Sequence, residues 1–181
     1  MKFDYVVDQN FFLTEEYVSI SNSLIEDKCD LTDLGAETVE KTAIVNITRW
    51  AHAKQYLSRL ENAVVGINRE VFGLDLYPLV DTDTVHFNQY HALYNGKYDW
   101  HKDGEKNNLY DYKLTILVNA STDEYDGGHL ELFINGPRHI KEFDTPGSVL
   151  IFPSYIEHRV TPVTQGTRKS ISMWMLGPNF R

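Results

Sequence analysis

Residues 146–163 read PGSVLIFPSYIEHRVTPV. An apolar run from Val149 to Phe152 follows a Pro-Gly turn, and a second short run begins near His158 after another turn. Runs of about four to eight apolar or β-branched residues bounded by Gly and Pro are typical of buried β-strands. This stretch therefore predicts two short neighbouring strands, with a histidine where the second one starts.

Outward from this stretch, the chain divides into a helical part and a part rich in strands. Helices are predicted over about 14–27, where Thr14 is a plausible N-cap, and over about 50–72, where apolar residues recur every three or four positions. Gly73 is the predicted end of the second helix. Strands are predicted at 3–7, 43–47, 75–79, 84–94, 98–103, 112–120, 129–134, 148–153, 157–161 and 168–176, separated by Gly- and Pro-containing turns.

Eight short strands after two helices predict a mostly β fold with flanking helices. The expected architecture is a double-stranded β-helix (jelly roll) packed against N-terminal helices. We expect one domain over residues 1–181, with helical support over about 1–73 and the jelly-roll core over about 74–177.

Composition excludes several classes of protein. The chain has 181 residues, of which 42% are hydrophobic, and a single cysteine, so a disordered tail, a disulfide framework and a Cys-rich zinc module are excluded. The sequence has no apolar run of about 18 residues, so no membrane span is expected. The N-terminal residues lack the apolar core of a signal peptide, which predicts a cytoplasmic, intracellular protein. A net charge of −9 disfavours nucleic acid as a partner.

Two histidines and one carboxylate have the spacing of metal ligands. His101 and Asp103 are two positions apart in a predicted strand, so their side chains point to the same face. His158 starts another predicted strand. A set of two histidines and one carboxylate is the facial triad of non-haem Fe(II) sites, which leaves coordination positions open, whereas a structural zinc is closed by four ligands. An isolated histidine is more often a surface or hydrogen-bonded residue, so the prediction depends on the whole set.

Arg168 follows His158 after a turn region that contains Pro162 and Gly166. It is therefore expected on a neighbouring strand, where its guanidinium can offer a two-pronged contact to a carboxylate. Ser170 shares its face of the strand. Most arginines are surface residues, but this position relative to a candidate ligand favours anion binding.

Several short motifs extend this pattern. They are Tyr98-x-x-His101-x-Asp103, the strand Leu114 to Asn119 with Gly127-Gly128-His129-Leu130, Pro146-Gly147, Phe152-Pro153, His158-Arg159-Val160-x-Pro162-Val163 and Arg168-x-Ser170. Over about residues 84–177 the sequence thereby resembles the Fe(II)- and 2-oxoglutarate-dependent oxygenases, most closely the prolyl 4-hydroxylase-like branch.

The resemblance implies a role for particular residues. It implies that the iron ligands are His101, Asp103 and His158, and that Arg168 and Ser170 bind the distal carboxylate of 2-oxoglutarate. It also implies that Thr115 lines the cosubstrate pocket and that Tyr94, with Tyr90 as the substitute, contacts the cosubstrate.

The resemblance also implies an activity. The expected enzyme uses Fe(II), 2-oxoglutarate and O2 to hydroxylate a C–H bond, on a prolyl or other residue of a peptide or protein. The alternatives, in order, are a hydroxylase of a free amino acid or other small molecule, a nucleic-acid demethylase, and a non-catalytic jelly-roll binding protein.

Other features have competing interpretations. His129 and Glu131 form a second same-face pair that could bind a different metal, although the resemblance points these positions away from the centre. Trp100 and Trp174 are expected to be packing residues. The polar segment 28–41 is most simply a solvated surface loop, although its residues 28–40 could instead form a lid over the substrate. The segment 104–111 is another flexible candidate, next to the predicted metal ligands.

Overall fold

The computed structural model describes residues 3–26, 41–104 and 109–180. Cys29, nearly all of the 28–41 segment and the centre of the 104–111 segment therefore lie outside the described residues. Among the described residues, no helix combines the length and the apolar character needed to cross a membrane.

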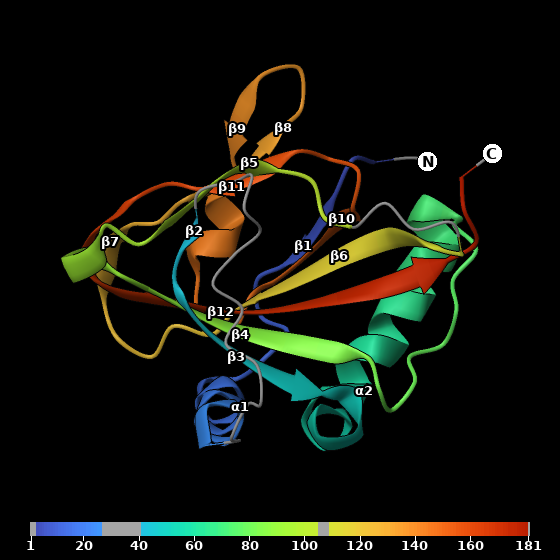
Figure 1. The fold of residues 1–181 in the computed structure, drawn as a ribbon, viewed down its shortest axis with the longest axis horizontal. Coiled ribbons are helices and arrows are strands. Elements are labelled where there is room, and N and C mark those ends of the chain that lie inside the picture. The colour runs from blue at the N-terminus through green and yellow to red at the C-terminus, as the bar shows by residue number, and fades with distance from the viewer. Residues whose placement is uncertain (1–2, 27–40, 105–108, 181) are drawn as a thin grey trace.

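Within the described residues, the strands form two antiparallel sheets (Figure 1). The seven-stranded major sheet has the order β1 (Val6–Asp8), β10 (Val149–Pro153), β6 (Asp111–Asn119), β12 (Val163–Gly177), β4 (Thr84–His91) and β3 (Ile44–Arg49), and β7 (Tyr125–Gly127) pairs with β12. The five-stranded minor sheet has the order β2 (Lys41–Thr42), β5 (Lys97–His101), β11 (His158–Val160), β8 (Leu130–Phe133) and β9 (Pro137–His139).

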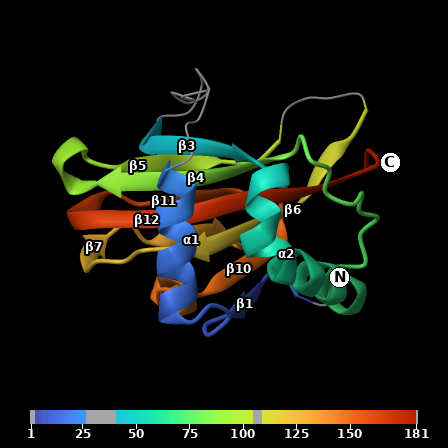
Figure 2. The ribbon, with the colours of Figure 1, turned by 90° about the horizontal axis from the view of Figure 1, so that it is seen from below.

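Two helices, α1 (Thr14–Glu26) and α2 (Trp50–Ile67), cover the outer face of the major sheet (Figure 2). The chain continues from α2 into a π-helical turn, η1 (Asn68–Phe72), which ends at Gly73 with a positive φ of 65°. A residue with a side chain adopts this backbone conformation at a cost, so Gly73 ends the helix as predicted. The prediction of a mostly β jelly roll packed against N-terminal helices is confirmed.

Alternation along the central strands divides the interior into two cores. On β6, Leu114, Ile116 and Val118 pack under the helices, whereas Leu117 points to the space between the sheets. On β12, the residues that face the helices are Ile171, Met173 and Met175. The other face of the same strands is therefore free to carry polar side chains into the space between the two sheets.

The N-terminal part of the chain contributes more than helical support. β1 pairs with β10 at one edge of the major sheet, and β3 pairs with β4 at the other edge. Both ends of the main strand order of this sheet thus come from residues before 73.

Some boundaries differ from the predicted ones. Residues 75–79 form no strand: the leucines at 74, 76 and 79 pack on the core beneath the helices, and Tyr77 makes a backbone hydrogen bond to Leu176 without a ladder. The predicted strand at 84–94 ends at His91 and continues as a 3₁₀ turn, η2 (Ala92–Tyr94). The short strands β2, β7 and β9 were not predicted from the sequence.

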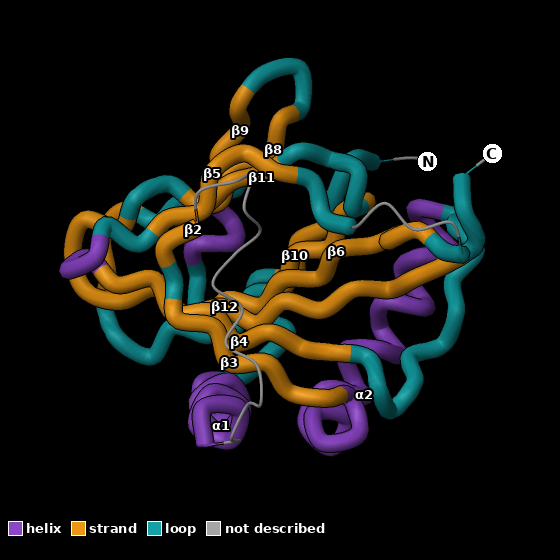
Figure 3. The backbone as a smooth tube through the Cα atoms, viewed as in Figure 1, coloured by secondary structure: helices purple, strands orange, loops and turns teal. Residues whose placement is uncertain are grey.

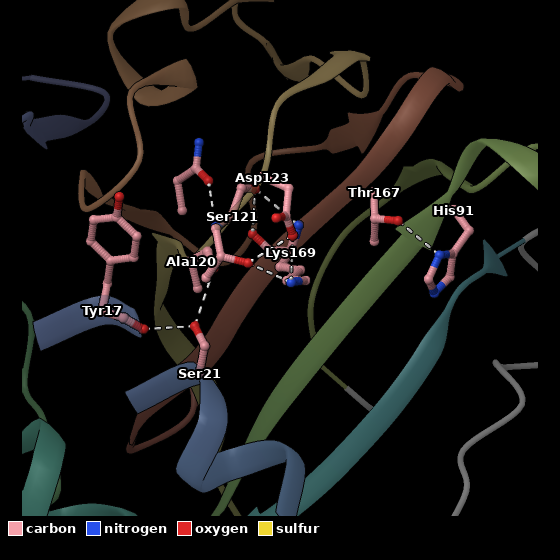
Figure 4. A network of polar contacts seen from close by, with 10 residues as sticks. Tyr17, Ser21, His91, Ala120, Ser121, Asp123, Thr167 and Lys169 are labelled. Atoms are coloured by element: carbon pink, nitrogen blue, oxygen red, sulfur yellow. Dashed lines mark hydrogen bonds and ion pairs between the residues drawn. The ribbon is translucent and has the colours of Figure 1, made fainter. Parts of the chain in front are cut away.

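Side-chain hydrogen bonds tie α1 to the end of the major sheet (Figure 4). The hydroxyl of Ser21 donates to the carbonyl oxygens of Tyr17 and Ala120, at 2.7 and 3.1 Å. Nearby, the Lys169 ammonium on β12 contacts Asp123 at 3.1 Å. In the minor sheet, β8 and β9 project as a hairpin (Figure 3), followed by the 3₁₀ turn η3 (Lys141–Asp144).

Truncating a core residue of α2 should destabilise the whole fold. Leu57 is fully buried between α2 and the major sheet, so Leu57→Ala is expected to lower the free energy of unfolding by about 2–5 kcal/mol. Gln55→Ala, on the exposed side of the same helix, should change it by less than about 0.5 kcal/mol. Urea unfolding followed by circular dichroism measures both, and equal effects would contradict the assigned helix face.

Candidate functional site

A cavity of about 130 Å³ that is lined by several polar side chains lies between the two sheets. Its walls come from the inner faces of β4 and β12 in the major sheet and from β5, β8 and β11 in the minor sheet. The lining residues are Lys41, His86, Asn88, Tyr90, Tyr98, His101, Asp103, Leu117, Leu130, His158, Val160, Arg168, Ser170, Ser172 and Trp174.

The structure brings the three predicted metal-ligating side chains together in this cavity. His101 ends β5 and His158 begins β11, and the two residues are direct partners across the minor sheet. The His101 Nε2 atom lies 3.6 Å from Asp103 Oδ1, and the His158 Nε2 atom lies 3.6 Å from Asp103 Oδ2. One ligand atom from each residue lies within 4.8 Å of the other two, so a single ion can contact all three.

Both imidazole rings are oriented by their own strands. His101 Nδ1 lies 2.7 Å from the carbonyl oxygen of Asp99, and His158 Nδ1 lies 3.1 Å from that of Ile156. A carbonyl oxygen accepts hydrogen bonds but cannot donate, so each Nδ1 carries a proton, and in the neutral ring Nε2 keeps its lone pair. The lone pairs face Asp103, which is the tautomer and orientation that a metal-binding histidine needs. This donor set fits Fe(II).

The Asp103 carboxylate is held by the major sheet. Its Oδ2 atom accepts hydrogen bonds from Thr115 Oγ1 on β6 at 2.7 Å and from Trp174 Nε1 on β12 at 2.9 Å. Burial by itself would raise the pKa of Asp103, but the two histidines and these two donors outweigh it and hold the pKa below its usual value. The carboxylate is therefore ionised.

His101 is neutral at physiological pH. Burial first, and then the electrostatic influence of the neighbouring His158 side chain, lowers the pKa of His101 to about 4. A neutral imidazole is the form that binds a metal ion, so His101 requires no deprotonation before binding.

Arg168 is a buried positive charge in the wall of the same cavity. It is 2% exposed, donates to Ser170 Oγ at 3.2 Å, and lies over the rings of Tyr90 and Phe143. Among the described residues, no carboxylate forms an ion pair with it. Buried charges are normally paired, so this guanidinium is suited to an anionic ligand.

The other predicted cosubstrate residues occupy different positions. Tyr90 lines the cavity beside Arg168, and burial raises the pKa of its phenol, which stays neutral. Tyr94 is 65% exposed on η2 and is not part of the cavity wall. Thr115 is fully buried and bonds Asp103 and Ser154 without lining the cavity. Sequence spacing alone did not separate Tyr90 from Tyr94, because the chain turns from strand to 3₁₀ helix between them.

Further cavity residues were not predicted to be site residues from the sequence. Trp174, expected to be a packing residue, lines the cavity and bonds Asp103. His86 stands edge-on to the Trp174 ring, with ring centroids 4.8 Å apart. Continuing the two-residue period of β12 from Arg168 and Ser170 would have identified Trp174. Lys41 had no such signal, because its strand β2 is two residues long.

The residues of the competing interpretations point away from the cavity. Glu131 on β8 pairs with Arg159 at 2.7 Å, and the Arg159 guanidinium also lies over the Trp100 ring. Trp100 packs edge-on against Phe133. Glu131 therefore does not share an ion with His129, and Trp100 has the packing role that was expected of it.

Comparison with known sequences identifies the family. The model of the 2OG-Fe(II) oxygenase superfamily matches residues 85–176. A PKHD-type hydroxylase of Acidovorax ebreus is 38% identical over 66 residues, which are 36% of this chain and 28% of the relative. A PKHD-type hydroxylase of Nitrosomonas eutropha is 27% identical over 175 residues, which are 90% of this chain and 74% of the relative.

Solved structures share the fold. A Pseudomonas putida prolyl-4-hydroxylase has a TM-score of 0.75 at 17% identity, covering 97% of this chain and 94% of that one. A Trichoplax adhaerens prolyl hydroxylase, in complex with a hypoxia inducible factor peptide fragment, has a TM-score of 0.70 at 16% identity, covering 96% and 84%. At such low identity these structures show the fold alone. Because the family match spans half of the sequence, the chain belongs to the 2OG-Fe(II) oxygenase superfamily.

Proposed function

We propose that this chain is an Fe(II)- and 2-oxoglutarate-dependent dioxygenase that hydroxylates a prolyl or other residue in a peptide or protein. The observation that carries the proposal is a buried Arg168 with no carboxylate partner among the described residues, in the cavity that also holds His101, Asp103 and His158. A dicarboxylate that binds metal at one end and a guanidinium at the other suits this arrangement.

His101, Asp103 and His158 would hold the iron. When bound, Fe(II) and 2-oxoglutarate supply the activation of O2, with one oxygen atom ending in the hydroxylated product and the other in succinate as CO2 leaves. The protein keeps both imidazole lone pairs and the Asp103 charge in place before any metal arrives. This preorganisation lowers the cost of assembling the site.

Arg168 would orient the cosubstrate. Its planar guanidinium can donate two parallel hydrogen bonds to the distal carboxylate, and Ser170 and the neutral Tyr90 phenol add hydroxyl groups beside it. Burial strengthens these contacts because little water competes for them.

The cavity wall around Trp174 supports a substrate with an apolar ring or chain. The indole of Trp174 and the imidazole of His86 form an aromatic edge beside Asp103, and Tyr112 stands edge-on to the same indole. The peptide complex of the Trichoplax adhaerens relative supports a peptide as the substrate class. A free amino acid or another small molecule is the second candidate, favoured by the small volume of the cavity, about 130 Å³.

Removing Asp103 should abolish activity. Loss of a residue that only supports a ligand typically costs about 10–100-fold, so Asp103→Ala, which removes a ligand, should lower 2-oxoglutarate turnover by more than about 100-fold. Succinate release in the presence of Fe(II) and O2 measures this. Glu70→Ala, which removes an exposed carboxylate from η1, is the control and should keep wild-type turnover. Wild-type turnover by Asp103→Ala would rule out the assigned ligand.

Removing the charge of Arg168 should weaken cosubstrate binding selectively. Truncating one partner of a buried charged pair costs about 2–5 kcal/mol, so Arg168→Met should raise the KM for 2-oxoglutarate by roughly 30-fold or more. Lys169→Met is the matched control, because Lys169 is the next residue on β12 and its ammonium points outward to Thr122 and Asp123. If both variants raised the KM equally, Arg168 would have no specific role.

The substrate class can be tested by adding O2 to the enzyme assembled anaerobically with Fe(II) and 2-oxoglutarate. Proline-containing peptides should stimulate succinate release above the uncoupled rate and gain one oxygen atom in mass, whereas free amino acids and nucleosides should not. Asp103→Ala supplies the background rate. Stimulation by free amino acids alone would favour the small-molecule alternative, and no stimulation by any panel would favour a non-catalytic binding protein.

A further inference from the structure

A second cluster of metal-ligating side chains lies outside the cavity. His129, His139 and Asp144 each offer one ligand atom, and these atoms lie within 4.8 Å of one another. His139 Nε2 lies 2.7 Å from Asp144 Oδ2, and His129 Nδ1 lies 3.6 Å from the same oxygen. The two imidazole centroids are 4.2 Å apart.

The fold of the projecting hairpin brings these residues together. His139 on β9 is paired across the hairpin with Glu131 on β8. His129 precedes Glu131 by two residues, so the two histidines share one side of the hairpin. Asp144 closes η3, the turn that follows β9. The residue just before β8, the strand β9 and the turn η3 therefore each contribute one ligand.

The distances between the ligand atoms are compatible with a shared ion. The His129–Asp144 separation of 3.6 Å is too long for a hydrogen bond. Ligand atoms at about 2.0–2.1 Å from one tetrahedral zinc lie about 3.3 Å apart. The observed separations of 2.7 and 3.6 Å lie on either side of this value. His139 contacts Asp144 at hydrogen-bond distance, whereas His129 approaches the same oxygen only at ion-pair distance.

The donor set and its exposure define the kind of ion. Imidazole nitrogens suit zinc, copper and nickel, whereas magnesium and calcium prefer oxygen ligands. The three side chains are between 24% and 46% exposed, so an ion can enter from solvent. His129 and Asp144 also line a cavity of about 500 Å³, which leaves room for water or another ligand to complete the coordination.

We propose that His129, His139 and Asp144 form a second metal site, selective for ions of the zinc type and separate from the His101, Asp103 and His158 cluster. The ion links η3 to the β8–β9 hairpin. The bound ion exchanges with ions in solution, because only three protein side chains hold it and one side of the site is open.

The test is zinc binding by equilibrium dialysis after metal removal with a chelator. The wild type should bind two equivalents of Zn²⁺. His129→Ala should bind one, His158→Ala should bind one, and the double variant should bind none. His129→Ala is the informative variant, because the direct His139–Asp144 contact that holds the turn remains. His52→Ala, which removes an exposed histidine of α2, is the control and should keep both equivalents.

These variants separate the second site from the proposed iron site. If the His158→Ala protein binds one equivalent of Zn²⁺ and the His129→Ala/His158→Ala double variant binds none, the second site is supported independently of the proposed iron site. Full wild-type binding by a folded His129→Ala protein, verified by circular dichroism, would overturn the proposal. Equal binding by His158→Ala and by the His129→Ala/His158→Ala double variant would also overturn it.

Discussion

The carboxylate of Asp103 is the point at which the two sheets depend on each other. It follows β5 of the minor sheet, yet it accepts its hydrogen bonds from Thr115 and Trp174 of the major sheet. Burying an unpaired carboxylate would cost several kcal/mol. The hydrogen bonds from Thr115 and Trp174 offset part of that cost. The position of Asp103 relative to the two histidines therefore depends on how far apart the two sheets lie and how they are rotated against each other.

This dependence extends through the register of the strands. Trp174 on β12 is the direct partner of Thr115 on β6, so the two donors to Asp103 sit side by side on one face. On the opposite face of β12, Met173 and Met175 pack under the helices. A slip of one residue would turn methionines into the cavity and polar residues toward α1 and α2. Burial under the helices therefore also fixes the position of the polar groups.

How much the sequence could predict follows from the same periodicities. The long elements α1, α2 and β6 were predictable, because each repeats its pattern over several turns or pairs. β12 was predicted only from residue 168, because Pro162 and Gly166 indicated a turn, whereas the strand begins at Val163. The His101, Asp103 and His158 cluster was predictable from strand spacing and family resemblance together. The support from Thr115 and Trp174 was not, because a hydrogen bond to Asp103 depends on how two separate sheets face each other. The exposure of Tyr94 was also missed, since η2 interrupts the strand before it.

The double glycine at 127–128 connects the two candidate sites. Gly128 has a φ of 61°, and a Cβ there would lie 2.9 Å from Arg168 Cδ, so the turn is both conformationally and sterically suited to glycine. Its neighbour His129 belongs to the outer cluster, and Asp144 of that cluster follows Phe143, whose ring lies 5.8 Å from the Arg168 guanidinium. Gly128 and Phe143 both lie beside Arg168, and the residue after each of them is a ligand of the outer cluster. An ion that holds those segments together would also restrict the walls around Arg168, because packed interiors transmit small displacements.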